Sequence, residues 1–71
     1  MDRFNGVLLL TPTEAFIEPN TLMEIDDDDC PDNACRARRA HDFFAKQGFD
    51  TGSPVSVLGT LAGGVLTIVR E

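Results

Sequence analysis

Residues 26–48 read DDDDCPDNACRARRAHDFFAKQG, and they contain the clearest helix signals of this 71-residue chain. Pro31 and Asp32 suit a helix start, because Pro is preorganised at the first helical position and an Asp side chain caps free backbone N–H groups. Gly48 suits the left-handed residue that follows a helix. Three apolar residues between these signals share one helical face: Ala37, Ala40 and Phe44. The stretch therefore predicts an amphipathic helix over about residues 31–47.

Upstream of this helix, apolar runs predict strands. Arg3 to Leu10 is apolar on both faces in its second half, which is typical of a covered strand, and Thr21 to Ile25 suits another. Glu14 to Glu18 leaves two structures open. Its three central apolar residues suit a short strand, whereas Thr11 to Glu14 has the spacing of a helical capping box. We favour the strand over the helical turn.

Downstream of the helix, the sequence predicts a β-hairpin. Val55 to Leu61 and Val65 to Glu71 are rich in β-branched residues, and they flank Ala62-Gly63-Gly64, where glycine supplies the positive φ of a tight turn. Gly59 favours a bend or bulge within the first arm. The five phenylalanines are the only large aromatic side chains, so we expect them to anchor the core: Phe4, Phe16, Phe43, Phe44 and Phe49.

The fold class that follows is α+β. We expect residues 1–71 to form a single domain, with one helix between the N-terminal strands and a C-terminal hairpin in a mixed barrel or sheet of four to five strands. This order of elements resembles the five-stranded OB-type barrel, and the V-x-V-x-G-x-L stretch at residues 55–61 is similar to strands found there. The resemblance implies single-stranded nucleic acid as a ligand. A net charge of −6 and the absence of Tyr and Trp argue against direct nucleic-acid binding.

Charge is segregated along the chain. Residues 4–35 contain eight carboxylates and no Lys or Arg, whereas residues 36–46 contain four cationic side chains and one carboxylate. A solvated acidic turn beside a basic helix accounts for this pattern, but the turn can also steer a basic protein partner. We therefore predict a small acidic, non-enzymatic protein-interaction module or accessory protein, with these partner-binding residues: Asp26, Asp27, Asp28 and Asp29. An acidic nucleic-acid mimic that inhibits a DNA-binding protein is an alternative.

Cys30 and Cys35 form the second alternative, a thiol or metal switch. With His41 they are the only grouped soft ligands, but the C-x4-C spacing differs from a zinc knuckle, and a helix would place Cys35 and His41 on different faces. We expect no metal and no cofactor. A disulfide between the two cysteines is geometrically conceivable, yet we expect reduced thiols, because we predict a cytoplasmic chain.

Other functional classes find little support in the residues. The acidic run lacks the glycine and the bidentate Glu of a calcium loop, and the sequence contains neither a G-x-S-x-G motif nor a P-loop. We therefore expect no enzyme activity. The longest aliphatic run, Val7–Leu10, is too short to span a membrane. If the strand at Val65–Val69 lies at an open edge of the sheet, it favours a homodimer formed by strand pairing.

Overall fold

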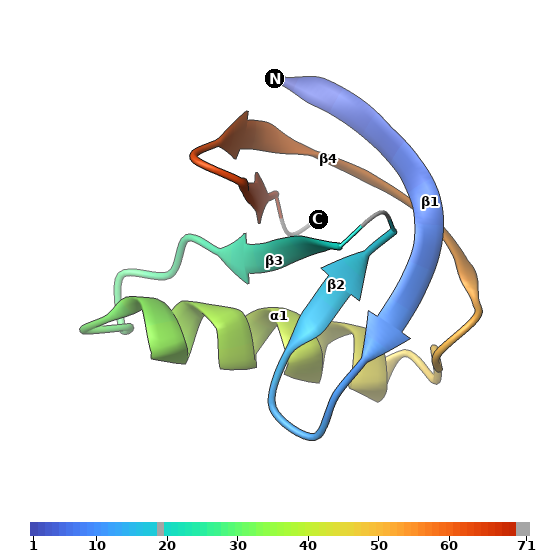
Figure 1. Cartoon of the computed structure of the whole chain (residues 1–71). Coiled ribbons are helices and arrows are strands. Elements are labelled where there is room, and N and C mark those ends of the chain that lie inside the picture. Colours follow the sequence, from blue (N-terminus) through green and yellow to red (C-terminus); the bar gives the residue numbers. More distant parts are fainter. Residues whose placement is uncertain (19, 70–71) are drawn as a thin grey trace.

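Five strands and one helix make up the chain in a computed structural model, which describes residues 1–18 and 20–69 (Figure 1). The elements are β1 (Asp2–Leu10), β2 (Ala15–Ile17), β3 (Thr21–Ile25), α1 (Asn33–Lys46), β4 (Pro54–Ala62) and β5 (Val65–Ile68). The strands close into a barrel in the order β1-β2-β3-β5-β4. Only β3 and β5 pair in parallel. The predicted small α+β, OB-like fold is confirmed.

A glycine in β1 and a glycine in β4 allow each of these strands to pair with two neighbouring strands. In β1, residues 2–7 pair with β4 and residues 8–10 pair with β2. Gly6 lies close to this change of partner, and a Cβ there would come within 2.8 Å of the Glu18 carbonyl oxygen. Gly59 pairs with both Asp2 of β1 and Ile68 of β5. Glycine is therefore required where strands of the barrel approach most closely.

The helix α1 begins and ends as its sequence predicts. Asp32 is the N-cap, and its Oδ1 accepts a hydrogen bond from the backbone N–H of Cys35 at 2.9 Å. Gly48 follows with φ of +82°, and the backbone N–H of Phe49 donates to the carbonyl oxygen of Phe44 at 3.2 Å. The Phe44 and Phe49 rings pack edge to face with centroids 5.9 Å apart. Local capping thus fixes both ends of α1.

The core fills the barrel and the space between the barrel and α1, which lies beneath β2 and β3 in Figure 1. Its buried members are Leu8, Ala15, Ile17, Met23, Ile25, Ala40, Phe44, Val55, Val57, Leu66 and Ile68. Phe44 is the only phenylalanine among these buried core residues. The expectation that all five phenylalanines anchor the core therefore holds in part: Phe4 and Phe43 pack against the core while partly buried, whereas Phe16 and Phe49 do not belong to it. Phe16 points outward from β2, because its neighbours Ala15 and Ile17 take the inward positions.

The ambiguous segment Glu14–Glu18 forms strand β2 at Ala15–Ile17, as favoured. The Thr11 side chain caps a turn instead of a helix, since its hydroxyl oxygen accepts a hydrogen bond from the backbone N–H of Glu14 at 2.9 Å. The hairpin turn is also confirmed: Gly63 and Gly64 have φ of +59° and +78°. The last two residues of the predicted strand 65–71 lie outside the described residues.

The closed barrel rules out one route to a homodimer. Strand β5 pairs with β3 on one side and with β4 on the other. The condition for dimerisation by strand pairing, an open edge at Val65–Val69, is therefore not met along Val65–Ile68, because barrel closure pairs the backbone groups on both sides of this strand. No helix in the described part of the chain is long and apolar enough to span a membrane.

Candidate functional site

The acidic turn, residues 26–29, contains one carboxylate with a structural role. Asp27 Oδ2 lies 3.4 Å from Arg39 Nη1 of α1, and its side chain is only 10% exposed. Asp27 Oδ1 accepts a hydrogen bond from the backbone N–H of Asp29, and its carbonyl oxygen accepts another from the N–H of Cys30. Charge-assisted bonds of this kind hold the turn against the helix. Asp27 therefore belongs to the folded framework.

The other carboxylates of the acidic turn face solvent. Asp26, Asp28 and Asp29 are exposed. No cluster of three or more His, Cys, Asp or Glu side chains suitable for a metal ion exists within the part of the chain that the structure describes. Three carboxylates therefore remain exposed next to the end of β3.

Cys30 and Cys35 are joined in a disulfide, with Cα atoms 5.3 Å apart. The expectation of reduced thiols is corrected by this pairing. Its physical reason is local: the Asp32 cap draws the first turn of α1 back toward the acidic turn, so Cys35 meets the buried Cys30. The bond covalently ties the acidic turn to α1. It also withdraws both sulfurs from the thiolate form that binds zinc.

His41 lies apart from the cysteines and interacts with Asp42 instead. His41 Nδ1 and Asp42 Oδ1 are 3.0 Å apart, and Arg38 Nε lies 3.5 Å from the same oxygen. The hydrogen bond with His41 lowers the pKa of Asp42 most, desolvation opposes this, and the Arg38 charge lowers the pKa further. These contacts order the exposed side of α1 and require no substrate.

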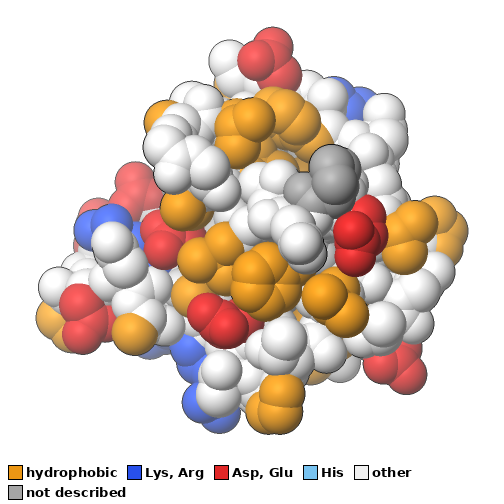
Figure 2. Space-filling view, in the orientation of Figure 1, with side chains coloured by type: hydrophobic (Ala, Val, Ile, Leu, Met, Phe, Trp, Pro, Cys, Tyr) orange, Lys and Arg blue, Asp and Glu red, His pale blue; other side chains and the backbone are white. Residues whose placement is uncertain are grey.

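A row of apolar side chains crosses the outer face of the barrel. In the strand register, Leu9 of β1 lies opposite Phe16 of β2, Phe16 opposite Leu22 of β3, and Leu22 opposite Val65 of β5. We call these four residues the outer row. Each is half-buried, because the alternate residues of its strand take the inward positions. Figure 2 shows apolar side chains gathered on this side of the molecule with acidic ones beside them.

Carboxylates flank the outer row. Glu14 and Glu18 lie two positions on either side of Phe16 and directly precede and follow β2. Glu24 follows Leu22 at the same spacing and lies opposite Thr67 of β5. Glu24 is only 8% exposed, and its carboxylate has no hydrogen bond or ion pair with the residues described.

Sequence reasoning missed the outer row because it assigned apolar residues to the core by type. The alternation Ala15-Phe16-Ile17 contains the relevant signal: only one side of a short strand faces the barrel interior. Which side faces inward depends on the pairing with β1 and β3, and a three-residue segment does not determine that pairing by itself.

Comparison of the chain with protein-family models, with curated proteins and with solved structures finds no match in any of the three.

Proposed function

We propose that the chain is a small acidic protein-interaction module, and that its outer row and flanking carboxylates bind a segment of another protein with both apolar and basic side chains. We call this surface the acidic face: the outer row together with Glu14, Glu18 and Glu24. One observation carries the proposal, namely the in-register apolar row Leu9–Phe16–Leu22–Val65 on the outside of a closed barrel. Contiguous apolar side chains on a surface are typical of docking sites.

Charge defines the chemistry of the partner. The carboxylates beside the row and the exposed Asp26, Asp28 and Asp29 at the end of β3 all have the same sign. They attract Lys and Arg side chains and accelerate encounter with a basic partner, while the apolar row supplies contact area. A second copy of this chain would place like charges against each other across a symmetric contact. A basic partner therefore fits this surface better than a homodimer.

The disulfide favours a second candidate, the thiol switch. Reduction of the Cys30–Cys35 bond by a dithiol would leave two thiols and release the acidic turn from its covalent tie to α1. The cytoplasmic location stays a prediction. In that compartment, Cys30 and Cys35 would be reduced thiols for most of the protein's lifetime. In an oxidising compartment the same bond is a permanent staple of a small domain.

A charge-reversal experiment tests the interaction module. Glu18→Lys changes a carboxylate beside the row, and Asp2→Lys makes the same change in charge at an exposed residue on β1. Tagged wild-type protein should retain a nuclease-resistant protein partner at low salt and lose it at high salt. Glu18→Lys should weaken that retention roughly fivefold or more, whereas Asp2→Lys should change it little.

Two outcomes would overturn the interaction module. Equal effects of both substitutions would show that net charge, not the acidic face, governs retention. Nuclease sensitivity of the captured material would show that nucleic acid is the ligand. Capture of a DNA-handling enzyme that DNA displaces would instead support the nucleic-acid mimic, because mimic and DNA must then share one site.

A further inference from the structure

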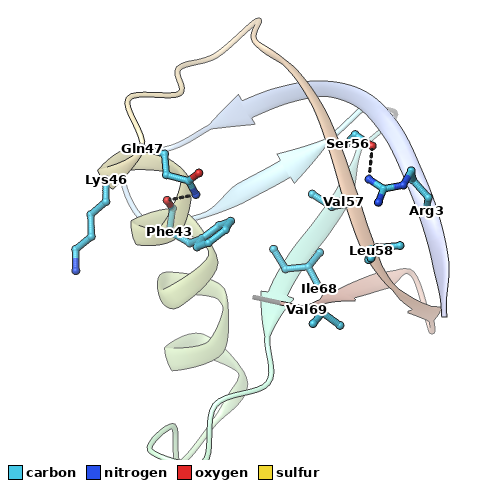
Figure 3. A pocket seen from close by; sticks show the side chains of 9 residues that line it. All are labelled: Arg3, Phe43, Lys46, Gln47, Ser56, Val57, Leu58, Ile68 and Val69. Carbon is cyan, nitrogen blue, oxygen red and sulfur yellow. Dashed lines mark hydrogen bonds between the residues drawn. The ribbon is translucent and has the colours of Figure 1, made fainter. Parts of the chain in front are cut away.

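A groove separate from the acidic face lies between the C-terminal half of α1 and strand β4. Its volume is about 500 Å³, within the range of small-molecule sites. Figure 3 shows the Phe43 ring extending from α1 toward Val57 and Ile68, which belong to the buried core. The half-buried Leu58 and the 43% exposed Val69 add accessible apolar surface to the lining of the groove. Arg3 and Ser56 lie at the other end of the groove, and Arg3 Nη1 donates a hydrogen bond to Ser56 Oγ at 2.9 Å.

The topology of the barrel explains why this groove exists. Strand β4 pairs with β1 from Pro54 to Gly59, but its pairing with β5 begins only at Gly59. The first half of β4 therefore has a partner strand on one side only. Helix α1 does not close this gap, because it packs mainly against β3 and β2. The groove therefore opens where neither β5 nor α1 covers the first half of β4.

Arg3 gives the groove a charge opposite to that of the chain as a whole. The chain has a net charge of −6, yet Arg3 forms no salt bridge with any carboxylate among the described residues. Its bond to Ser56 uses one of the five N–H donors of the guanidinium. The remaining donors have no partner among the described residues, and a guanidinium binds a carboxylate with two parallel hydrogen bonds.

We propose that this groove binds a small amphipathic carboxylate. The apolar body of the ligand packs on Phe43, Leu58 and Val69, and its carboxylate accepts hydrogen bonds from Arg3 and Ser56. The stem of Lys46 lines the opposite rim, while its ammonium group extends away from the groove in Figure 3. The site differs from the acidic face in location and in the sign of its charge, so it stands or falls independently of the interaction module.

The test is a titration of the isotopically labelled chain with octanoate, followed by amide resonances. We expect saturable shifts centred on Phe43, Leu58 and Val69. Octanol has the same apolar body without charge, and octylammonium has the opposite charge, so both should bind at least roughly threefold more weakly. Shifts that do not saturate, or that spread over the acidic face, would overturn the proposal, as would equal binding of octanol.

Matched variants locate the carboxylate. Arg3→Gln removes the guanidinium from the exposed end of the groove, and Arg38→Gln removes one from the exposed side of α1 outside it. We expect Arg3→Gln to weaken octanoate binding roughly fivefold and to leave octanol binding unchanged. Arg38→Gln should change neither. If both variants weaken octanoate equally, the effect comes from net charge and the assignment to Arg3 is wrong.

Discussion

Replacing Gly59 with Ala should destabilise the barrel more than any other single-methyl change at a glycine. A Cβ at this position would overlap the carbonyl oxygen of Thr67 and lie 3.1 Å from the Cα of Ile68. Both are backbone atoms, so rotation of a side chain cannot relieve the overlap. Strand β4 pairs with β1 and β5 at this residue, and moving it away from one partner stretches the other pairing.

The expected cost of Gly59→Ala follows from these contacts. Overpacking costs about 1–3 kcal/mol, and a weakened ladder hydrogen bond adds about 1 kcal/mol. A domain of this size has a total stability of only about 3–5 kcal/mol. Gly59→Ala should therefore lose about 2–4 kcal/mol, which is most of this stability, and urea titration followed by circular dichroism measures the loss directly.

Gly48→Ala is the matched control for this prediction. Gly48 has φ of +82° and nothing within 4 Å of its would-be Cβ, so the change introduces backbone strain without overlap. It should cost about 1 kcal/mol. A Gly59→Ala variant with a urea midpoint equal to or above that of Gly48→Ala would refute the account of how the barrel closes.

Two further predictions concern the cysteines and pH. Reduction of the Cys30–Cys35 disulfide, or its replacement by two serines, should lower the free energy of unfolding by roughly 2 kcal/mol, because the closed loop is short; equal urea midpoints with and without a dithiol would contradict this. The pKa of Asp42 is lowered by its hydrogen bond with His41 and by Arg38, so the ionised carboxylate stabilises the fold above the unfolded pKa of about 3.8, and this contribution is lost as pH falls through the lower folded value. Asp42→Asn should flatten the pH dependence of unfolding below about pH 4, and an unchanged pH dependence would contradict the assigned contacts.

The parts of the fold that the sequence predicted correctly depend on local chemistry. Asp32 and Gly48 determine the ends of α1 through capping and positive φ, and both operate within a few residues of chain. Gly63 and Gly64 determine the hairpin turn in the same way. Such signals survive in any tertiary context that leaves the turn exposed, which is why the order of strands and helix could be read before the fold was known.

The parts that the sequence did not predict depend on pairing between distant residues. Phe16 faces outward only because β2 joins β1 and β3 in a particular register, and an apolar residue looks the same in sequence on either side of a strand. The groove at Arg3 arises where β1 is brought next to β4 and α1, from which it is distant in the chain. The surfaces on which both proposals rest are therefore properties of the assembled barrel.

The acidic turn shows the same limit at short range. Sequence reasoning grouped Asp26 to Asp29 as one partner-binding set, but Asp27 turns inward to Arg39 while the other three stay exposed. It also discounted the Cys30–Cys35 bond on grounds of compartment, whereas the geometry of the turn brings the two sulfurs together. Four adjacent carboxylates cannot all occupy one environment, since each residue of a turn points in a different direction.

The most direct test of the acidic face compares two threonine substitutions in quantitative partner capture at low salt. Phe16→Thr removes the centre of the outer row, while Leu61→Thr removes a 51% exposed side chain that lies outside it. Threonine suits a strand at both positions, and circular dichroism of each variant confirms the fold. We predict that Phe16→Thr loses the partner and Leu61→Thr retains it. Full retention by a folded Phe16→Thr variant would contradict the central claim that the outer row is the docking surface.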